Sequence, residues 1–316
     1  MTTGRAYLQL HAAVFLAGVT AVLGELITVA ALPLVWWRVL IAAASFVPLY
    51  YLRPGARLKV RLRRPDGSRS TAVKLFGIGA LVGLHWVTFY GSVKLANASV
   101  ALVCFALVSP LTALLEPLLL RGHRFDRTEF ALGCLVLPGM LLVAGVIRAD
   151  YYAGFVVGIA SAALAATFGT LNKRCVAEVR TVDLSLLEMT GALATLTLLY
   201  PLLAGLDFGG GGFWPTAADW AYLVVLALAC TTLAYLLATD ALRVLSAFTV
   251  NLAYGLEPVY GILLAAVLLR QYEELSPGFY AGAALITLAV FGHGWLARRR
   301  GSRSRSAPLH QASRKA

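Results

Sequence analysis

Residues 246–270 read SAFTVNLAYGLEPVYGILLAAVLLR, an apolar run with one carboxyl side chain, Glu257, near its middle. A helix needs about 20 apolar residues to cross the roughly 30 Å hydrocarbon layer of a membrane. Lipid offers no partner to backbone polar groups, so a span is either a helix or a strand of a closed barrel. Because apolar and polar residues do not alternate in this run, the sequence predicts a helix.

Similar apolar runs cover most of the chain. The ten expected spans are residues 9–29, 34–52, 72–93, 98–121, 126–147, 153–173, 183–205, 218–240, 246–270 and 276–297. Hydrophobic residues make up 59% of the chain and charged residues 13%, whereas about 25% of the residues of a soluble domain are charged. The sequence therefore predicts an all-α integral membrane protein with ten transmembrane helices.

The basic residues divide unequally between the two sides of these spans. Counted from the N-terminus, 23 of the 27 Lys and Arg residues fall on the side that holds both termini. The other side holds Arg38, Lys94, Arg148 and Arg270. Cytoplasmic loops carry the basic excess, so we expect a cell (inner) membrane protein with both termini in the cytoplasm. The net charge of +12 then faces anionic lipid headgroups, and without a folded basic domain we expect no nucleic-acid partner.

Pairs of similar features recur at a spacing of 148 to 150 residues. They are Arg38 and Glu188, Trp86 and Tyr235, Pro110 and Pro258, and Arg121 and Arg270. Five spans per half is an odd number, so the second half enters the membrane from the opposite side. We expect two inverted five-helix repeats, residues 1–149 and 150–297, followed by a basic cytoplasmic tail without regular structure, residues 298–316. Such repeats are common in alternating-access transporters, whose binding site lies near the midplane between the repeats.

Glu257 is the foremost candidate for a functional group. Asn251, Tyr254 and Glu257 share one helix face, and Pro258 leaves the carbonyl of residue 254 without its helical donor. A polar stripe beside a broken hydrogen bond suits the wall of a cavity. Ionisable groups inside a membrane are costly and commonly functional, so we expect Glu257 to bind an amine or to carry a proton. The alternative is a carboxyl group that is hydrogen-bonded to a neighbouring helix.

The third and eighth spans carry further candidate binding residues. They are His85, Trp86 and Tyr90 in the third span and Tyr235 and Thr239 in the eighth. An imidazole among aromatic rings can contact a substrate or relay protons, and hydroxyl groups can bind a ligand. The alternative for all five is packing or hydrogen bonding between helices.

Glu25 and Arg38 are both expected near the outer face of the membrane. Opposite charges near one face normally pair. We therefore expect an external ion pair with a structural or gating role.

Motifs for catalysis and for metal binding are absent from the sequence. It contains no HExxH, no GxxxxGK[ST] and no paired Asp-rich box. The four cysteines do not have CxxC spacing. We therefore expect no catalytic residues, no metal site and no cofactor.

Three segments carry a resemblance to a known family: LVWWRVLIAA at 34–43, HWVTFYGSVKLANASVAL at 85–102 and NLAYGLEPVYGILLA at 251–265. Over about residues 9–297, the chain resembles the drug/metabolite transporter (DMT) superfamily, EamA type. Arg38 corresponds to the family's arginine at the start of the second span. The resemblance implies a ten-helix inverted repeat around a central cavity, built mainly by spans three, four, eight and nine. It also implies export or exchange of small metabolites, such as amino acids, without ATP.

We therefore expect a secondary active transporter whose partners are a small-molecule substrate, the lipid bilayer and, as candidates, protons. The substrate site would contain His85, Trp86 and Tyr90 from the first half. From the second half it would contain Tyr235, Thr239, Asn251, Tyr254 and Glu257. An uncoupled facilitator or channel is the main alternative, and a membrane-embedded enzyme that modifies lipids is a further one. No feature of the sequence specifies the substrate, the direction of transport or the oligomeric state.

Overall fold

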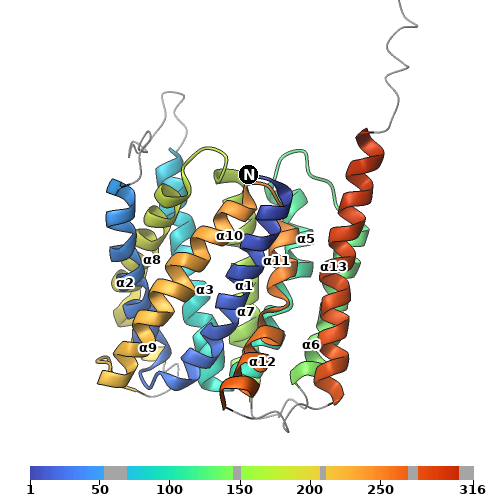
Figure 1. Ribbon diagram of the computed structural model, residues 1–316. Helices are drawn as coiled ribbons and strands as arrows, with labels where there is room; N and C mark the ends of the chain where they lie inside the picture. Colours follow the sequence, from blue (N-terminus) through green and yellow to red (C-terminus); the bar gives the residue numbers. More distant parts are fainter. Residues whose placement is uncertain (53–69, 145–150, 207–210, 270–276, 306–316) are drawn as a thin grey trace, which may run out of the picture.

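The computed structural model describes residues 1–52, 70–144, 151–206, 211–269 and 277–305, and every regular element within these ranges is a helix (Figure 1). The first part of the chain forms α1 (Thr3–Leu26), α2 (Ala31–Leu52), α3 (Thr71–Leu95), α4 (Ala98–Phe105), α5 (Val108–Leu119) and α6 (Arg127–Ala144). The second part forms α7 (Tyr152–Cys175), α8 (Thr181–Leu203), η2 (Ala204–Leu206), α9 (Ala217–Ala227), η3 (Leu228–Leu233), α10 (Ala234–Leu242), α11 (Ala247–Tyr254), α12 (Glu257–Leu269) and α13 (Pro277–Arg305).

Polar side chains fix where several of these helices begin. The Asn97 side chain accepts a hydrogen bond from Val100 N (2.9 Å) at the start of α4. Thr216 and Asp219 form a capping box at the start of α9, and Ser246 caps α11. These side chains supply acceptors for backbone N–H groups that have no partner within the helix.

Eight helical stretches of the described chain are long and apolar enough to cross a membrane. They are Thr3–Leu26, Ala31–Leu52, Thr71–Leu95, Val100–Leu119, Tyr152–Cys175, Thr181–Leu203, Ala217–Leu242 and Pro277–Leu296. Each overlaps one of the expected spans, so the protein is a multi-pass membrane protein. The other two expected spans, 126–147 and 246–270, coincide with α6 and with α11 and α12 together. Residues 145–147 and 270 lie outside the described residues.

The fourth and ninth expected spans are not continuous helices. The first is divided into α4 and α5 at Ala106–Leu107, and the second into α11 and α12 at Gly255–Leu256. Pro110 and Pro258 lie in the first turns of α5 and α12, where a missing N–H is tolerated because that turn has no helical acceptor. Both helices are therefore interrupted where a proline removes the hydrogen bond that would join the two pieces.

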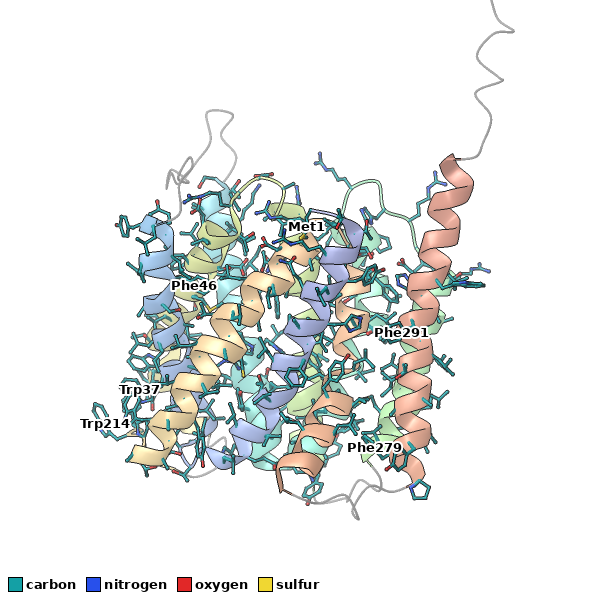
Figure 2. All side chains as sticks on the ribbon, viewed as in Figure 1. Met1, Trp37, Phe46, Trp214, Phe279 and Phe291 are labelled. Atoms are coloured by element: carbon teal, nitrogen blue, oxygen red, sulfur yellow. The ribbon has the colours of Figure 1, made fainter. Side chains whose placement is uncertain are left out.

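The distribution of side chains is that of a protein surrounded by lipid. Large apolar side chains such as Leu118 and Leu198 lie on the surface of the bundle, about four-fifths exposed (79% and 80%). Charged groups such as Arg38 and Glu188 are buried inside it. Figure 2 shows Trp37 and Trp214 together on the outer edge of the bundle, and their ring centroids are 5.6 Å apart. An aromatic cluster at this position is typical of the boundary between membrane and water.

Both ends of the described chain lie at the same end of the bundle. Figure 1 shows the start of α1 and the end of α13 there, and we refer to it as the terminal end. The expectation that the tail loses regular structure from residue 298 is wrong for its first part, because α13 continues through Arg305. Residues 306–316 lie outside the described residues.

Glycines allow α3 and α8 to approach each other closely. A Cβ atom placed on Gly79 would lie 2.1 Å from the carbonyl oxygen of Glu188, and one on Gly191 would lie 2.2 Å from that of Phe76. Neither position can take a side chain unless the backbone moves. The contact between these two helices therefore fixes the place of Glu188.

Substitution Gly79→Ala should lower the free energy of unfolding by about 1–3 kcal/mol, the usual cost of overpacking. Thermal unfolding of the purified protein in detergent measures this change. Gly77→Ala is the matched control, because a Cβ there has no heavy atom within 4 Å. Equal unfolding temperatures for the two variants would show that close packing of α3 on α8 does not contribute.

Candidate functional site

A cavity of about 130 Å³ lies in the interior of the bundle. Its wall combines aromatic rings with a few polar groups from both parts of the chain. The lining residues are Ala17, Thr20, Arg38, His85, Trp86, Phe89, Phe105, Ala165, Phe168, Gly169, Asn172, Cys230, Thr231, Ala234, Tyr235, Ala238, Thr239, Leu242, Ala247, Val250, Asn251, Tyr254 and Glu257. A mostly apolar cavity with a small number of polar groups is the usual form of a small-molecule site.

The structure brings seven of the eight expected binding residues together around this cavity. They are His85, Trp86, Tyr235, Thr239, Asn251, Tyr254 and Glu257. The eighth, Tyr90, is fully buried behind the wall. Its hydroxyl accepts a hydrogen bond from Arg38 Nη1 (3.2 Å) and donates one to the carbonyl of Thr20 (3.4 Å). Tyr90 therefore positions Arg38 and does not face the cavity itself.

The expected ion pair between Glu25 and Arg38 does not form. Glu25 lies in the last turn of α1, where its carboxylate accepts a hydrogen bond from Ala98 N (3.1 Å) at the start of α4. Arg38 is buried, 3% exposed, and lines the cavity. The prediction placed both residues by their depth along a span, but depth does not say whether a side chain points toward the lipid boundary or into the bundle.

Arg38 is held by an aromatic ring and by hydroxyl groups. Its guanidinium carbon lies 4.2 Å from the ring centroid of Trp86, a cation–π contact. Arg38 Nε donates to Thr231 Oγ1 at 2.6 Å, across the two parts of the chain. Within the described chain, no carboxylate forms an ion pair with this guanidinium. A buried cation of this kind is a ready binding group for an anion that enters the cavity.

A π-helical turn places the hydroxyl that Arg38 contacts. The turn is η3, between α9 and α10. Within it, Thr231 Oγ1 donates to the carbonyl of Leu226, five residues earlier (2.7 Å). This leaves the oxygen lone pairs of Thr231 available to Arg38 Nε. Single π-helical turns often occur at functional sites, and no feature of the sequence marked this one.

Glu257 is the first residue of α12, at the break that follows α11. It is buried and lines the cavity, and its carboxyl makes no hydrogen bond to other described residues. The helix N-terminus favours a negative charge there. The cavity wall therefore carries a cation, Arg38, and a carboxyl group, Glu257, and neither of them has an ion-pair partner in the described chain.

His85 is fixed by helix α7. Its Nδ1 lies 2.9 Å from Ser161 Oγ and 3.1 Å from the carbonyl oxygen of Ser161. The ring is surrounded by those of Phe89, Phe105 and Phe168, with centroids 5.4 to 6.2 Å away. Nδ1 thus holds α3 against α7, and Nε2 is the ring nitrogen that a ligand could contact.

A hydrogen-bond network around Glu188, behind the cavity wall, was not expected from the sequence. Glu188, which entered the sequence analysis only through its spacing from Arg38, accepts hydrogen bonds from the Tyr235 hydroxyl and from Asn172 Nδ2. Tyr235 and Asn172 line the cavity, whereas Glu188 lies behind them. A buried carboxyl within a span was a signal that could have identified it.

Polar contacts tie the helices together at the end opposite the terminal end. Asp219 accepts hydrogen bonds from the backbone N–H and the hydroxyl of Thr28, both at 2.7 Å. Lys94 Nζ donates to the carbonyl of Ile27 at 2.7 Å. These contacts join α9 and α3 to the segment between α1 and α2.

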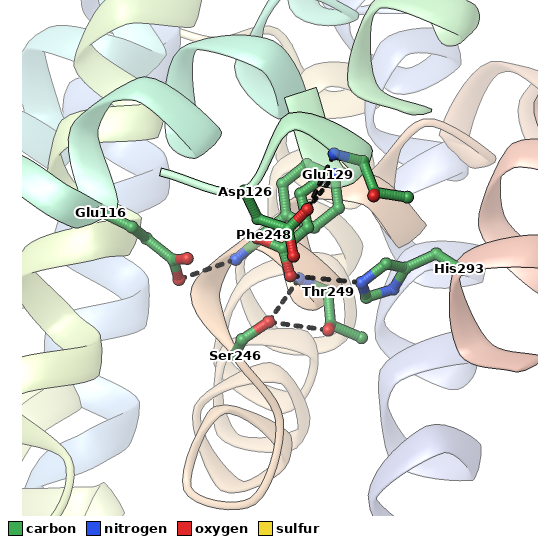
Figure 3. Close-up of polar contacts among 8 residues, drawn as sticks. Glu116, Asp126, Glu129, Ser246, Phe248, Thr249 and His293 are labelled. Atoms are coloured by element: carbon green, nitrogen blue, oxygen red, sulfur yellow. Dashed lines mark hydrogen bonds and ion pairs between the residues drawn. The ribbon is translucent and has the colours of Figure 1, made fainter. Parts of the chain in front are cut away.

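Different contacts join the helices at the terminal end. Figure 3 shows the Glu116 carboxylate accepting from Phe248 N (3.1 Å) and His293 beside Glu129 (3.4 Å). The lining of the cavity reaches Leu242 and Ala247, where α10 ends and α11 begins. The cavity therefore extends toward the terminal end of the bundle. Among the described residues, no three His, Cys, Asp or Glu side chains are grouped as a metal site would need.

The model of the EamA-like transporter family matches the chain twice, over residues 4–145 and 152–294. The chain belongs to the EamA-like transporter family. The breaks at 106–107 and 255–256 occupy equivalent places in the two matched segments, 149 residues apart. The family is one of membrane transporters.

A solved crystal structure has the same fold as this EamA-like chain. It matches 94% of this chain and 99% of its own, with 22% sequence identity and a TM-score of 0.72. Among curated proteins, no sequence match was found.

Substitution Thr231→Val should weaken the attachment of Arg38, because Nε then loses its closest acceptor. Hydrogen bonds to charged groups contribute about 1.5–3 kcal/mol, and we expect a loss of that size in thermal unfolding. Thr190→Val is the control, because the exposed Thr190 hydroxyl donates only within its own helix, to Leu186. If both variants unfold at the temperature of the unsubstituted protein, Thr231 does not hold Arg38.

Proposed function

We propose that this EamA-like protein is a secondary active transporter that exports or exchanges small amino-acid-like metabolites by alternating access, without ATP. The observation that carries the proposal is the cavity wall, which holds Arg38 and Glu257 without ion-pair partners among the described residues. A zwitterionic solute would satisfy both groups, with its carboxylate on Arg38 and its amine on Glu257. The rings of Trp86, Phe105 and Phe168 would contact its apolar part.

The proposed architecture is ten transmembrane helices in two inverted repeats, residues 1–149 and 150–297. The two family matches and the equivalent breaks in the fourth and ninth spans support it. In inverted-repeat transporters, broken helices line the site near the midplane. Glu257 lies at the break between α11 and α12, Asn251 lies near it, and both line the cavity, as this arrangement requires.

We place both termini in the cytoplasm and the protein in a bacterial-type inner membrane. The excess of Lys and Arg on the side of the termini supports this orientation. The cavity that extends to Leu242 and Ala247 would then lead to the cytoplasm. A transporter whose cavity opens to the cytoplasm would bind a substrate there for export. Glu25 would act at the external face, where it holds the start of α4.

Counterflow of a radiolabelled amino acid into proteoliposomes tests the site. We expect Glu257→Gln to reduce initial counterflow at least tenfold, because a neutral amide cannot pair with the amine of the substrate. We expect His85→Ala to reduce it as well, through loss of the contact between α3 and α7. Glu178→Gln, an exposed carboxyl outside the cavity, is the matched control and should keep its activity. Unchanged counterflow in both cavity variants would exclude this site.

Ligand chemistry can be tested by thermal shift in detergent. A ligand at 100 times its Kd stabilises the folded state by about 2.7 kcal/mol. Three compounds with the same side chain are compared. The amino acid should raise the unfolding temperature, whereas its amide, which lacks the carboxylate, and its deaminated acid, which lacks the amine, should have little effect. Arg38→Gln should abolish the response to the amino acid. An equal response to all three compounds would contradict recognition of both charged groups.

A further inference from the structure

We propose that Glu188 holds the coupling proton of transport and exchanges it with the cavity through Tyr235. This inference rests on the proposed function, because a coupling proton has meaning only in a transporter. It assigns to Glu188 a role separate from that of Glu257, which faces the cavity directly.

The Glu188 carboxyl lies directly behind the cavity wall. Glu188 is fully buried in α8, and its Oε2 accepts hydrogen bonds from the Tyr235 hydroxyl and from Asn172 Nδ2 (3.2 Å). Asn172 Nδ2 also lies 3.4 Å from the Tyr235 hydroxyl oxygen. Tyr235 and Asn172 form part of the cavity wall. Glu188 is therefore one side chain away from the cavity and is connected to it by a hydroxyl group that can both donate and accept.

Acceptors outnumber donors in the surroundings of Glu188. Three buried oxygens here have no hydrogen-bond partner in the described chain: Glu188 Oε1, Asn172 Oδ1 and Ser185 Oγ. A carboxylate and an amide oxygen can only accept. One proton on Glu188 turns a carboxyl oxygen from an acceptor into a donor and so reduces the excess of acceptors.

No cation of the described chain compensates a negative charge on Glu188. Within the described chain, no Lys, Arg or His nitrogen forms an ion pair with Glu188. An unpaired carboxylate inside a membrane protein is costly, whereas a protonated carboxyl is neutral. The surroundings of Glu188 therefore favour the form that carries the proton.

The nearest titratable groups on the neighbouring helices do not supply Glu188 with a cation. Tyr235 of α10 and Cys175 of α7 face Glu188, and neither is a cation. On α3, His85 is bonded to Ser161 and Lys94 to Ile27. Lys74 of α3 interacts electrostatically with the Cys175 thiol. On α2, Arg38 is directed at Thr231, Tyr90 and Trp86.

Release of the proton requires no other reactant. With the Tyr235 hydroxyl turned from Glu188 toward the cavity, Glu188 Oε2 donates its proton to the Tyr235 oxygen while the hydroxyl passes its own proton to water or substrate in the cavity. One proton leaves Glu188, one reaches the cavity, and Tyr235 is neutral before and after. Reprotonation follows the same route in reverse.

The packing of Tyr235 explains how substrate and proton could be coupled. Its ring contacts that of Trp86 at a centroid distance of 6.4 Å, and Trp86 carries Arg38 on its face. Arg38 and Glu188, which are 150 residues apart, thus each contact an aromatic residue of their own half, and the two rings meet in the cavity wall. A substrate bound to Arg38 displaces this pair of rings and so changes the contact between Tyr235 and Glu188.

The test compares two transport assays on the full chain in proteoliposomes. Counterflow at equal pH does not depend on proton movement, whereas accumulation driven by a pH gradient does. Glu188→Gln should keep counterflow within about twofold and lose accumulation driven by the pH gradient at least tenfold. Tyr235→Phe should also reduce this accumulation, whereas Glu257→Gln should lose both activities. Accumulation that persists in Glu188→Gln, or that follows a sodium gradient and not the pH gradient, would overturn the proposal.

Infrared difference spectroscopy in H₂O and D₂O gives a readout that does not require transport. A protonated-carboxyl band of the unsubstituted protein should persist in Glu257→Gln and be lost from Glu188→Gln. Its presence in all three would overturn the assignment of the proton to Glu188. Failure of counterflow in the unsubstituted protein would contradict the proposed function but would leave this spectroscopic test intact. Size-exclusion chromatography confirms that each variant is folded.

Discussion

The hydrogen bond from Arg38 Nε to Thr231 Oγ1 holds a cation in the largely apolar interior of the bundle. No ion pair neutralises that cation among the described residues, so its charge must be shared by hydroxyl groups, a carbonyl and the face of Trp86. This demand explains the π-helical turn η3, which turns the Thr231 hydroxyl to the guanidinium. It also explains why Tyr90 is fully buried, because its hydroxyl supports Arg38 from behind.

The broken helices complete the cavity that this cation faces. At Gly255–Leu256, the chain makes short i→i−3 hydrogen bonds in place of helical ones, and the helix that follows begins with Glu257. A continuous helix could not present a helix N-terminus halfway across a membrane. The break therefore places the carboxyl group of Glu257 at a helix N-terminus inside the bundle, where the partial positive charge of the N-terminus stabilises a negative charge.

The two parts of the chain place an arginine and a glutamate at corresponding positions. Arg38 on α2 stacks on Trp86, and Glu188 on α8 is hydrogen-bonded to Tyr235, with both aromatic rings in the cavity wall. Glycines position the carboxyl side of this arrangement, since Gly79 of α3 lies directly against the backbone of Glu188. Small residues thus bring the helices close enough for polar groups to meet inside the membrane.

The sequence by itself determined the membrane class, the approximate spans, and seven polar or aromatic residues of the cavity wall, because hydrophobic length and in-span polar residues are local properties. It did not reveal the places of Glu25 and Arg38, the helical continuation to Arg305, or the turn η3. Only the tertiary structure decided that Arg38 lines the cavity, that Tyr90 lies behind it, and that Glu188 contacts Tyr235. Depth along a span follows from position in the sequence. The direction of a side chain and its partner follow from the rotation of each helix against its neighbours, which long-range packing sets.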